Sequence, residues 1–125
     1  MPDAPTLGVD FARALAAKDF DRVEELMHPQ LDFRGMTPSR SWEATSPTSL
    51  ITDVLVKWFE AEDVIEGLEA VETDSFADRT RLGYRFVGHN ADGPFVVEQQ
   101  AYLAERDGRI GWMRVLCSGF RPRSG

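Results

Sequence analysis

The sequence predicts an α+β fold in which three N-terminal helices precede a mainly antiparallel sheet. Up to about residue 60, apolar residues recur with the 3.6-residue period of amphipathic helices. After Glu62 and Asp63 the pattern alternates with period two, as in half-buried strands. Clusters of Asn, Asp and Gly separate the alternating segments, which is typical of hairpins. Helices followed by hairpins are the α+β layout, and the 125 residues suit one domain over 1–125.

The first two helices are expected to be short and amphipathic. The first begins near Thr6, a candidate N-cap, and ends near Lys18, with Phe11, Ala14 and Leu15 on one stripe. The second follows an aspartate cap at residue 19 or 21 and ends at residues 28–29, because a residue before proline is disfavoured in a helix. The apolar residues of this second helix are Val23, Leu26 and Met27.

The third helix is predicted to be the most buried. Residues 37–41 are rich in turn formers, and residues 45–47 offer N-caps. The buried stripe of this helix comprises Leu50, Ile51, Val54, Leu55, Trp58 and Phe59. A short strand is expected at 31–34, and longer strands at about 64–73, 79–88, 95–105 and 109–119. Turns are expected at 73–75, 90–94 and 106–108.

Composition excludes several classes of function. Fourteen Lys and Arg residues against 21 Asp and Glu residues give a net charge of −7, which disfavours nucleic acids and anionic membranes as partners. The single cysteine, Cys117, cannot form an internal disulfide or a structural zinc site, and His28 and His89 lie far apart, so we predict neither metal nor cofactor. Without a signal sequence or a long apolar run, the chain is expected to be cytoplasmic.

Three segments resemble a known superfamily. Residues 17–21 join the first two helices, residues 28–34 lead into the first strand, and residues 107–110 open the last strand. Their order is similar to that in the nuclear transport factor 2-like superfamily, the cystatin-like α+β cone, with its SnoaL-like and ketosteroid-isomerase-like branches. The resemblance covers nearly the whole chain. It implies a strongly curved sheet whose concave face holds the helices around a conical, mostly apolar pocket, and an outer face that commonly forms a homodimer.

The last hairpin decides which side chains share a face of the sheet. A three-residue loop at 106–108 would pair Tyr102 with Trp112 and Gln100 with Arg114. A two-residue Asp-Gly turn is the alternative, and it would mix polar and apolar side chains. We favour the three-residue loop, because it separates an aromatic and hydrogen-bonding face, with Glu98, from an apolar face. The apolar face comprises Val97, Gln99, Ala101, Leu103, Met113, Val115 and Cys117.

The polar face is predicted to line the pocket. Glu98 is the candidate general acid and base, and Arg114 the candidate clamp for a carbonyl or an anion. Their alternative role is a structural ion pair across neighbouring strands. Six residues are predicted to contact the ligand: Gln100, Tyr102, Trp112, Trp42, Trp58 and Tyr84. Cys117 is expected to be a packing residue, since no basic residue adjoins it in the sequence.

The predicted function is that of a small-molecule pocket protein. The resemblance implies a SnoaL-like cyclase or isomerase that acts by acid/base chemistry on an apolar, carbonyl-bearing ligand. The alternative is a non-catalytic ligand-binding or dimeric accessory domain, because Phe11 and Gly35 stand where ketosteroid isomerases have their Tyr and Asp. Limonene-epoxide-hydrolase-like members of the superfamily carry their catalytic residues at positions that are Gln100, Tyr102 and Ser118 in this chain, so that machinery is missing too. The apolar face of the last hairpin is expected to form a homodimer.

Overall fold

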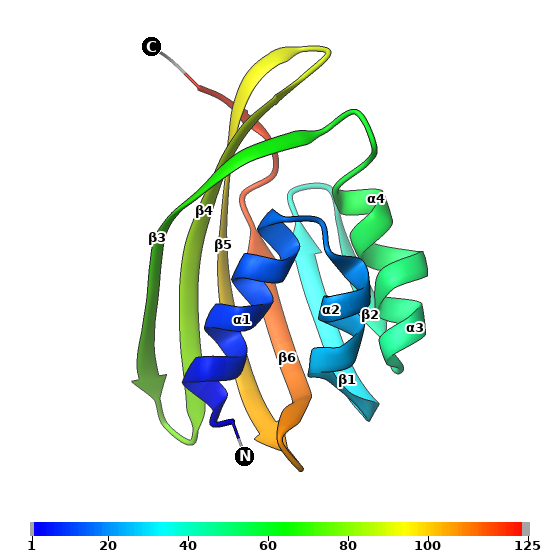
Figure 1. Ribbon diagram of the computed structural model, residues 1–125, viewed down its shortest axis with the longest axis vertical. Helices are drawn as coiled ribbons and strands as arrows, with labels where there is room; N and C mark the ends of the chain where they lie inside the picture. The colour runs from blue at the N-terminus through cyan, green and yellow to red at the C-terminus, as the bar shows by residue number, and fades with distance from the viewer. Residues whose placement is uncertain (1, 124–125) are drawn as a thin grey trace.

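The predicted α+β fold is confirmed by the computed structural model, which describes residues 2–123 (Figure 1). The helical segments are α1 (Ala4–Ala16), α2 (Phe20–Leu26), α3 (Pro47–Ser49), the π-helix η1 (Leu50–Leu55) and α4 (Val56–Trp58). The strands are β1 (Met27–Thr37), β2 (Arg40–Ala44), β3 (Val64–Phe76), β4 (Arg79–Asn90), β5 (Gly93–Arg106), β6 (Arg109–Cys117) and β7 (Arg121–Pro122). Among residues 2–123, no helix has the length and hydrophobicity to cross a membrane.

The first two helices are set by aspartate caps. The side chain of Asp3 accepts a hydrogen bond from the backbone N–H of Thr6 at 3.0 Å, so α1 begins before the predicted cap. Lys18, with a φ of 53°, ends the turn after α1, and Asp19 then caps α2 through the N–H of Arg22 at 3.1 Å. These contacts fix where the two helices meet the sheet.

The third predicted helix is present but is not one regular α-helix. Ser46 and Ser49 form a capping box at its start, and the six residues from Leu50 to Leu55 then wind as a π-helix before α4 closes the segment. Leu50, Val54 and Leu55 are buried as predicted. The segment ends at Trp58, whose position becomes important for the site.

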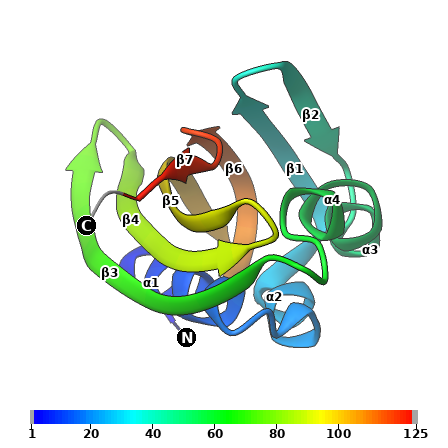
Figure 2. The same ribbon diagram turned by 90° about the horizontal axis from the view of Figure 1, so that it is seen from above.

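Seven strands form one curved, unclosed sheet in the order β2-β1-β6-β5-β4-β3. The pair β1–β6 is parallel and every other pair is antiparallel, with β7 pairing to the start of β5. Figure 2 shows the sheet bending from β3 around to β6 and on to β1 and β2, with the helices on its inner side. β1 is longer than the predicted strand at 31–34, and Trp42 lies in β2 instead of in a turn.

The register of the last hairpin differs from the favoured prediction. Asp107 and Gly108 form a two-residue turn, with φ of 53° and 79°. The partner of Ala104 is Trp112, whereas Glu105 pairs with Ile110, so Gly111 is an extra residue in a β-bulge. The extra residue restores the grouping of side chains on each face that a three-residue loop would have given. It also shifts the pairing, so that the partner of Tyr102 is Arg114 instead of Trp112. The turn predicted at 73–75 is also displaced, to residues 77–78.

The faces of the sheet are therefore grouped as predicted but oriented the opposite way. The apolar face of β5 and β6 is turned toward the helices, and Val97, Ala101, Leu103 and Met113 are each 0% exposed. The predicted dimer face is thus the core, because the larger apolar surface gains most from burial under α1. The polar face lies outside. The candidate site residues of β5 and β6 therefore lie on the side of the sheet that faces away from the helices.

Candidate functional site

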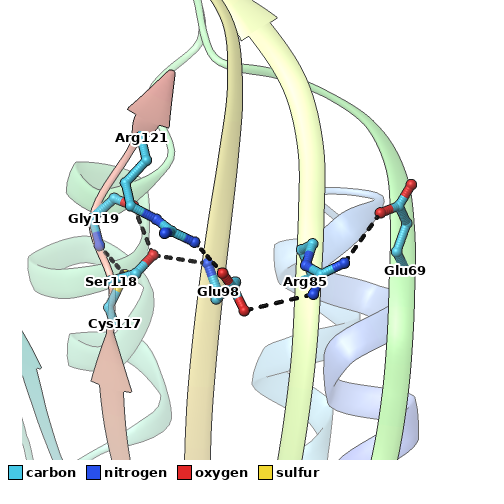
Figure 3. Close-up of polar contacts among 7 residues, drawn as sticks. All are labelled: Glu69, Arg85, Glu98, Cys117, Ser118, Gly119 and Arg121. Atoms are coloured by element: carbon cyan, nitrogen blue, oxygen red, sulfur yellow. Dashed lines mark hydrogen bonds and ion pairs between the residues drawn. The ribbon is translucent and has the colours of Figure 1, made fainter. Parts of the chain in front are cut away.

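Glu98 lies on the outer face of the sheet, within a chain of ion pairs (Figure 3). Its carboxylate contacts Arg121 and lies 3.7 Å from Nη2 of Arg85. The other terminal nitrogen of Arg85, Nη1, lies 3.7 Å from the Glu69 carboxylate. The Oγ of Ser118 accepts a hydrogen bond from the backbone N–H of Glu98 at 2.9 Å. The catalytic role of Glu98 stays a prediction, and its position outside the cone gives that role no support.

Arg114, also on the outer face, pairs with Asp32 rather than with Glu98. Its Nη1 lies 3.2 Å from the Asp32 carboxylate and donates to the Asp32 carbonyl oxygen at 3.0 Å. The Trp112 ring lies between two guanidinium groups, 4.5 Å from that of Arg114 and 4.3 Å from that of Arg79. The alternative Glu98–Arg114 ion pair is therefore wrong, because each residue has other partners.

Two predicted ligand-binding residues are also outside the cone. The Tyr102 ring packs on Phe76 with 5.4 Å between centroids, and Gln100 accepts a hydrogen bond from Nη1 of Arg81 at 2.9 Å. Glu98, Gln100, Tyr102, Trp112 and Arg114 thus share a face, as predicted, but that face looks away from the helices. That these residues contact a ligand stays a prediction, and such a ligand would have to bind the outer face of the sheet.

A row of polar side chains crosses the inner face at Tyr84, Gln99 and Cys117. Strand pairing places these three residues side by side on β4, β5 and β6, and they are 3%, 1% and 8% exposed. The Tyr84 hydroxyl donates to Oε1 of Gln99. Burial, and to a smaller extent Cys117, raises the pKa of Tyr84 well above its usual range, so this hydroxyl is a neutral donor. The Gln99 amide nitrogen has no hydrogen-bond partner.

Trp58 supplies the second unpaired polar atom of the interior. Its side chain is buried, yet the indole Nε1 has no partner. The ring packs against Phe33 and Trp42, with centroids 6.1 and 6.2 Å away, and lies over Gly35, where an added Cβ would come within 2.7 Å of it. Gly35 therefore leaves room for the indole ring. The buried unpaired side-chain atoms of residues 2–123 are these two nitrogens, and both are donors.

A hollow of about 520 Å³, the mouth pocket, opens beside this interior row. It lies where the β1–β2 turn, the end of α4, the start of β3, the β4–β5 turn and the segment after β6 meet. Trp58 and Cys117 belong to its wall, and Gln99 is the strand partner of Cys117. The remaining lining residues are Thr37, Pro38, Ser39, Trp42, Lys57, Phe59, Glu60, Glu62, Asp63, Asn90, Asp92, Ser118, Gly119 and Phe120.

Asp63 is a residue of the mouth pocket that the sequence patterns did not single out. The run from Glu60 to Asp63 reads as a solvated edge, but Asp63 is only 8% exposed. Its carboxylate accepts hydrogen bonds from the N–H of Glu60 and from Nδ2 of Asn90, both at 3.0 Å. These bonds join the end of α4 to the end of β4, so Asp63 holds the rim together. An Asp five residues after the end of α4 was the one available signal.

A second hollow, the outer groove, lies on the opposite face over β2, β1, β6 and β5 and measures about 580 Å³. Met36 and Leu116 are strand partners in its floor and are 57% and 58% exposed. Charged residues of both signs flank them, with Arg34 opposite Glu43. Within residues 2–123 there is no cluster of three His, Cys, Asp or Glu side chains suited to a metal ion.

Comparison with solved structures shows the fold of the ketosteroid-isomerase-like and nuclear transport factor 2-like proteins. A candidate isomerase from Bacillus subtilis superposes with a TM-score of 0.77 at 16% identity, over 92% of this chain and 86% of that chain. A protein of ketosteroid isomerase-like fold from Catenulispora acidiphila, in complex with trimethylamine, gives 0.71 at 14% identity, over 92% and 87%. A candidate polyketide cyclase from Xanthomonas campestris gives 0.70 at 15% identity, over 90% and 88%.

No protein-family model matches the sequence, and no curated protein matches it either. At these identities the structural similarity establishes the fold alone. The chemistry of the site must be argued from its own residues. The described cone offers two buried hydrogen-bond donors without acceptors, an aromatic wall and a hydrogen-bonded carboxylate at the rim.

Proposed function

We propose that this protein binds an apolar small molecule through an acceptor oxygen, such as a carbonyl, in the mouth pocket. The observation that carries the proposal is that Trp58 Nε1 and Gln99 Nε2 are both buried, both donors and both unpaired. A buried donor without an acceptor costs about 1–3 kcal/mol, and a ligand oxygen would remove that cost. The oxygen would meet Trp58 in the pocket wall, with Gln99 as the deeper donor behind Cys117.

The size and chemistry of the mouth pocket support a small ligand. Its volume of about 520 Å³ lies within the range of small-molecule sites, and aromatic side chains contribute much of its wall. An anionic ligand has little support, because Glu60, Glu62, Asp63 and Asp92 also line the pocket. The proposed ligand is of the apolar, carbonyl-bearing class predicted from sequence. Of the predicted contacts, Trp42 and Trp58 line this pocket, whereas Glu98, Arg114 and their neighbours on the outer face do not.

Acid/base catalysis is the second candidate function. Asp63 favours it, since this carboxylate is buried and lines the same pocket as Trp58. The fold shared with a candidate isomerase and a candidate polyketide cyclase gives it general support. A ligand held by Trp58 would then exchange a proton with Asp63, and Asp63→Asn would abolish turnover while the ligand still binds.

Binding of two matched probes tests the leading proposal. Acetophenone has a carbonyl where α-methylstyrene has a methylene group of similar shape. We expect isothermal titration calorimetry to show acetophenone binding about five- to tenfold more tightly, the value of one net hydrogen bond. Trp58→Phe, which removes the indole N–H, should bring this ratio close to one.

Trp112→Phe is the matched control, because this tryptophan lies on the outer face between Arg79 and Arg114. The control should keep the wild-type preference for the ketone. Equal affinity of the wild type for the two probes would overturn the proposed oxygen contact. Loss of the preference in Trp112→Phe but not in Trp58→Phe would instead place the site on the outer face.

A further inference from the structure

We infer that the ligand of the mouth pocket carries a positively charged amine, held at the rim while the oxygen end is buried. This inference rests on the proposed function, since it concerns the same pocket. It starts from the combination of aromatic rings and unpaired carboxylates around the opening. Trp58, whose buried Nε1 has no partner, belongs to the same wall and points independently to a ligand.

Four aromatic rings belong to the lining of the mouth pocket: Trp42, Trp58, Phe59 and Phe120. Trp58 and Trp42 meet nearly edge to face, and Phe59 contacts Phe120 with 5.9 Å between ring centroids. Phe120 is 39% exposed, so its ring is available at the surface. A cation over an aromatic face gains about 0.5–2 kcal/mol, and rings arranged as walls are the usual site for alkylated ammonium groups.

The Trp42 ring already stabilises a cation within the protein. The guanidinium of Arg40 lies 3.8 Å from its centroid, while its Nε1 donates to Thr37 at 3.0 Å. With this face of Trp42 occupied, Phe120 is the lining ring most open to a ligand, because Trp58 and Phe59 are buried.

Carboxylates belong to the same lining. Four of them line the pocket, against the single cation Lys57. Within residues 2–123, none of Glu60, Glu62 and Asp92 has a cationic side chain within 4.0 Å, whereas Glu98 on the outer face has two. The ammonium group of Lys18 contacts the backbone oxygen of Glu60, not its carboxylate. The rim thus carries negative charge that the chain itself does not neutralise.

The residues in and behind the pocket wall therefore favour different groups on one ligand. The donors Trp58 Nε1 and Gln99 Nε2 need an oxygen, and the aromatic and acidic rim favours a cation. An apolar molecule with a ketone or ester at one end and a tertiary or quaternary amine at the other satisfies both. The net charge of −7 adds a weak attraction for the same class of molecule.

Three aryl ketones that differ in charge test the inference. Phenacyltrimethylammonium is the cation, 3,3-dimethyl-1-phenylbutan-1-one is its uncharged carbon analogue of the same shape, and 3-benzoylpropionate is an anion. Calorimetry at low salt should show the cation binding about tenfold more tightly than the neutral ketone, the effect of one to two exposed carboxylates. The anion should bind more weakly than both, and added salt should reduce the advantage of the cation.

Glu62→Gln/Asp92→Asn removes two rim charges from exposed side chains. This variant should lose most of the preference for the cation and keep its affinity for the neutral ketone. Asp21→Asn/Asp53→Asn is the matched control, because it removes the same charge from exposed positions on α2 and η1. The control should retain the preference.

The outcomes distinguish a failure of the amine inference from a failure of the proposed function. If the neutral ketone binds as tightly as the cation, the amine inference is overturned and the proposed function stands. If Asp21→Asn/Asp53→Asn lowers the preference as much as the rim variant, the effect is one of net charge and the inference is again overturned. If none of the three ketones binds, the proposed function itself fails.

Discussion

Tyr84 and Gln99 form a buried polar pair that leaves one donor unused. The hydroxyl of Tyr84 satisfies Oε1 of Gln99, and the amide nitrogen of Gln99 has no acceptor. A folded chain that needed only stability would have apolar residues at these two positions, because polar groups are retained in a core at a cost. The proposed ligand would supply the acceptor that the Gln99 amide nitrogen lacks.

Replacing one or both members of the pair tests this explanation. Tyr84→Phe alone should lower the free energy of unfolding by about 1–3 kcal/mol, because Oε1 of Gln99 then loses its donor. Tyr84→Phe/Gln99→Leu should recover most of that loss, since neither position then holds an unpaired polar atom. Urea denaturation measures both values. A double variant less stable than the single variant would contradict the assignment.

Alkaline pH tests the burial of Tyr84 separately. Its pKa is raised in the folded protein above the ordinary value of 10.0, so the unfolded chain loses this proton first. The stability contributed by the neutral hydroxyl is complete below that value and is lost as the pH rises toward the raised pKa. Between about pH 10 and about pH 11 the wild type should lose up to about 1.4 kcal/mol per pH unit more than Tyr84→Phe. Equal slopes in urea denaturation would show that Tyr84 is accessible in the folded state.

Gln99 stands out in the sequence, but the alternating pattern alone does not show that its side chain lies in the interior. Gln99 is the one hydrogen-bonding residue on an otherwise apolar face of β5, and that face was predicted correctly as a group. Its direction was predicted wrongly, because alternation shows which residues share a face but not which face is covered. Trp58 and Tyr84, which the sequence analysis named as ligand contacts, are both interior, and their contact with a ligand stays a prediction.

At the scale of elements, the β5–β6 hairpin shows how a local feature sets register. Asp107 and Gly108 form the tight turn, and Gly111 adds the bulge that shifts the offset by one residue. The tight turn and the bulge both differ from the predicted three-residue loop. Together they keep the predicted polar and apolar side chains on separate faces of the hairpin. Gly111 was a signal for the bulge, since a glycine inside a strand often marks one, but the favoured three-residue loop assumed a regular strand there and gave other pairing partners.

The turn also provides a local test of the hairpin. Gly108 has a φ of 79°, which residues with a Cβ rarely adopt, so Gly108→Ala should cost about 1 kcal/mol of stability. Ala104→Gly is a comparison within the same hairpin that leaves the turn intact. Thermal unfolding would show the loss as a decrease in Tm of a few degrees, roughly 3–6 °C for a domain of this size. An unchanged Tm in Gly108→Ala would contradict a turn with positive φ.

For the whole molecule, the outer groove is the surface on which we expect a homodimer. The predicted interface, which included Val97 and Met113, is wrong because those residues are core, whereas Met36 and Leu116 are exposed side by side. Arg34 and Glu43 flank them, and charges of both signs on one face can pair across a two-fold axis. The homodimer itself stays a prediction.

Light scattering of matched variants checks the dimer. Leu116→Lys places a charge in the floor of the outer groove and should convert a dimer to a monomer at micromolar concentration. Val64→Lys, at an exposed position on β3, should leave the assembly unchanged. A wild-type protein that is monomeric throughout this range would contradict the expected interface.

The fold was predictable because its evidence is spread over the chain, in the change of hydrophobic period and the order of elements. The site was not, because it depends on which way a sheet curves and on two single atoms, Nε1 of Trp58 and Nε2 of Gln99. Asp63 was missed for the same reason, since its burial arises from contacts with Glu60 and Asn90 that no local pattern reveals.

The measurement that tests the central claim most directly is a nitrogen–proton correlation spectrum of the three tryptophan indole groups during titration with acetophenone. Trp58→Phe assigns one resonance and Trp112→Phe another. The account predicts that the Trp58 indole proton moves downfield and saturates as the ketone binds, while Trp112 stays in place. A saturating shift of Trp112 with no change at Trp58 would contradict a ligand oxygen in the mouth pocket.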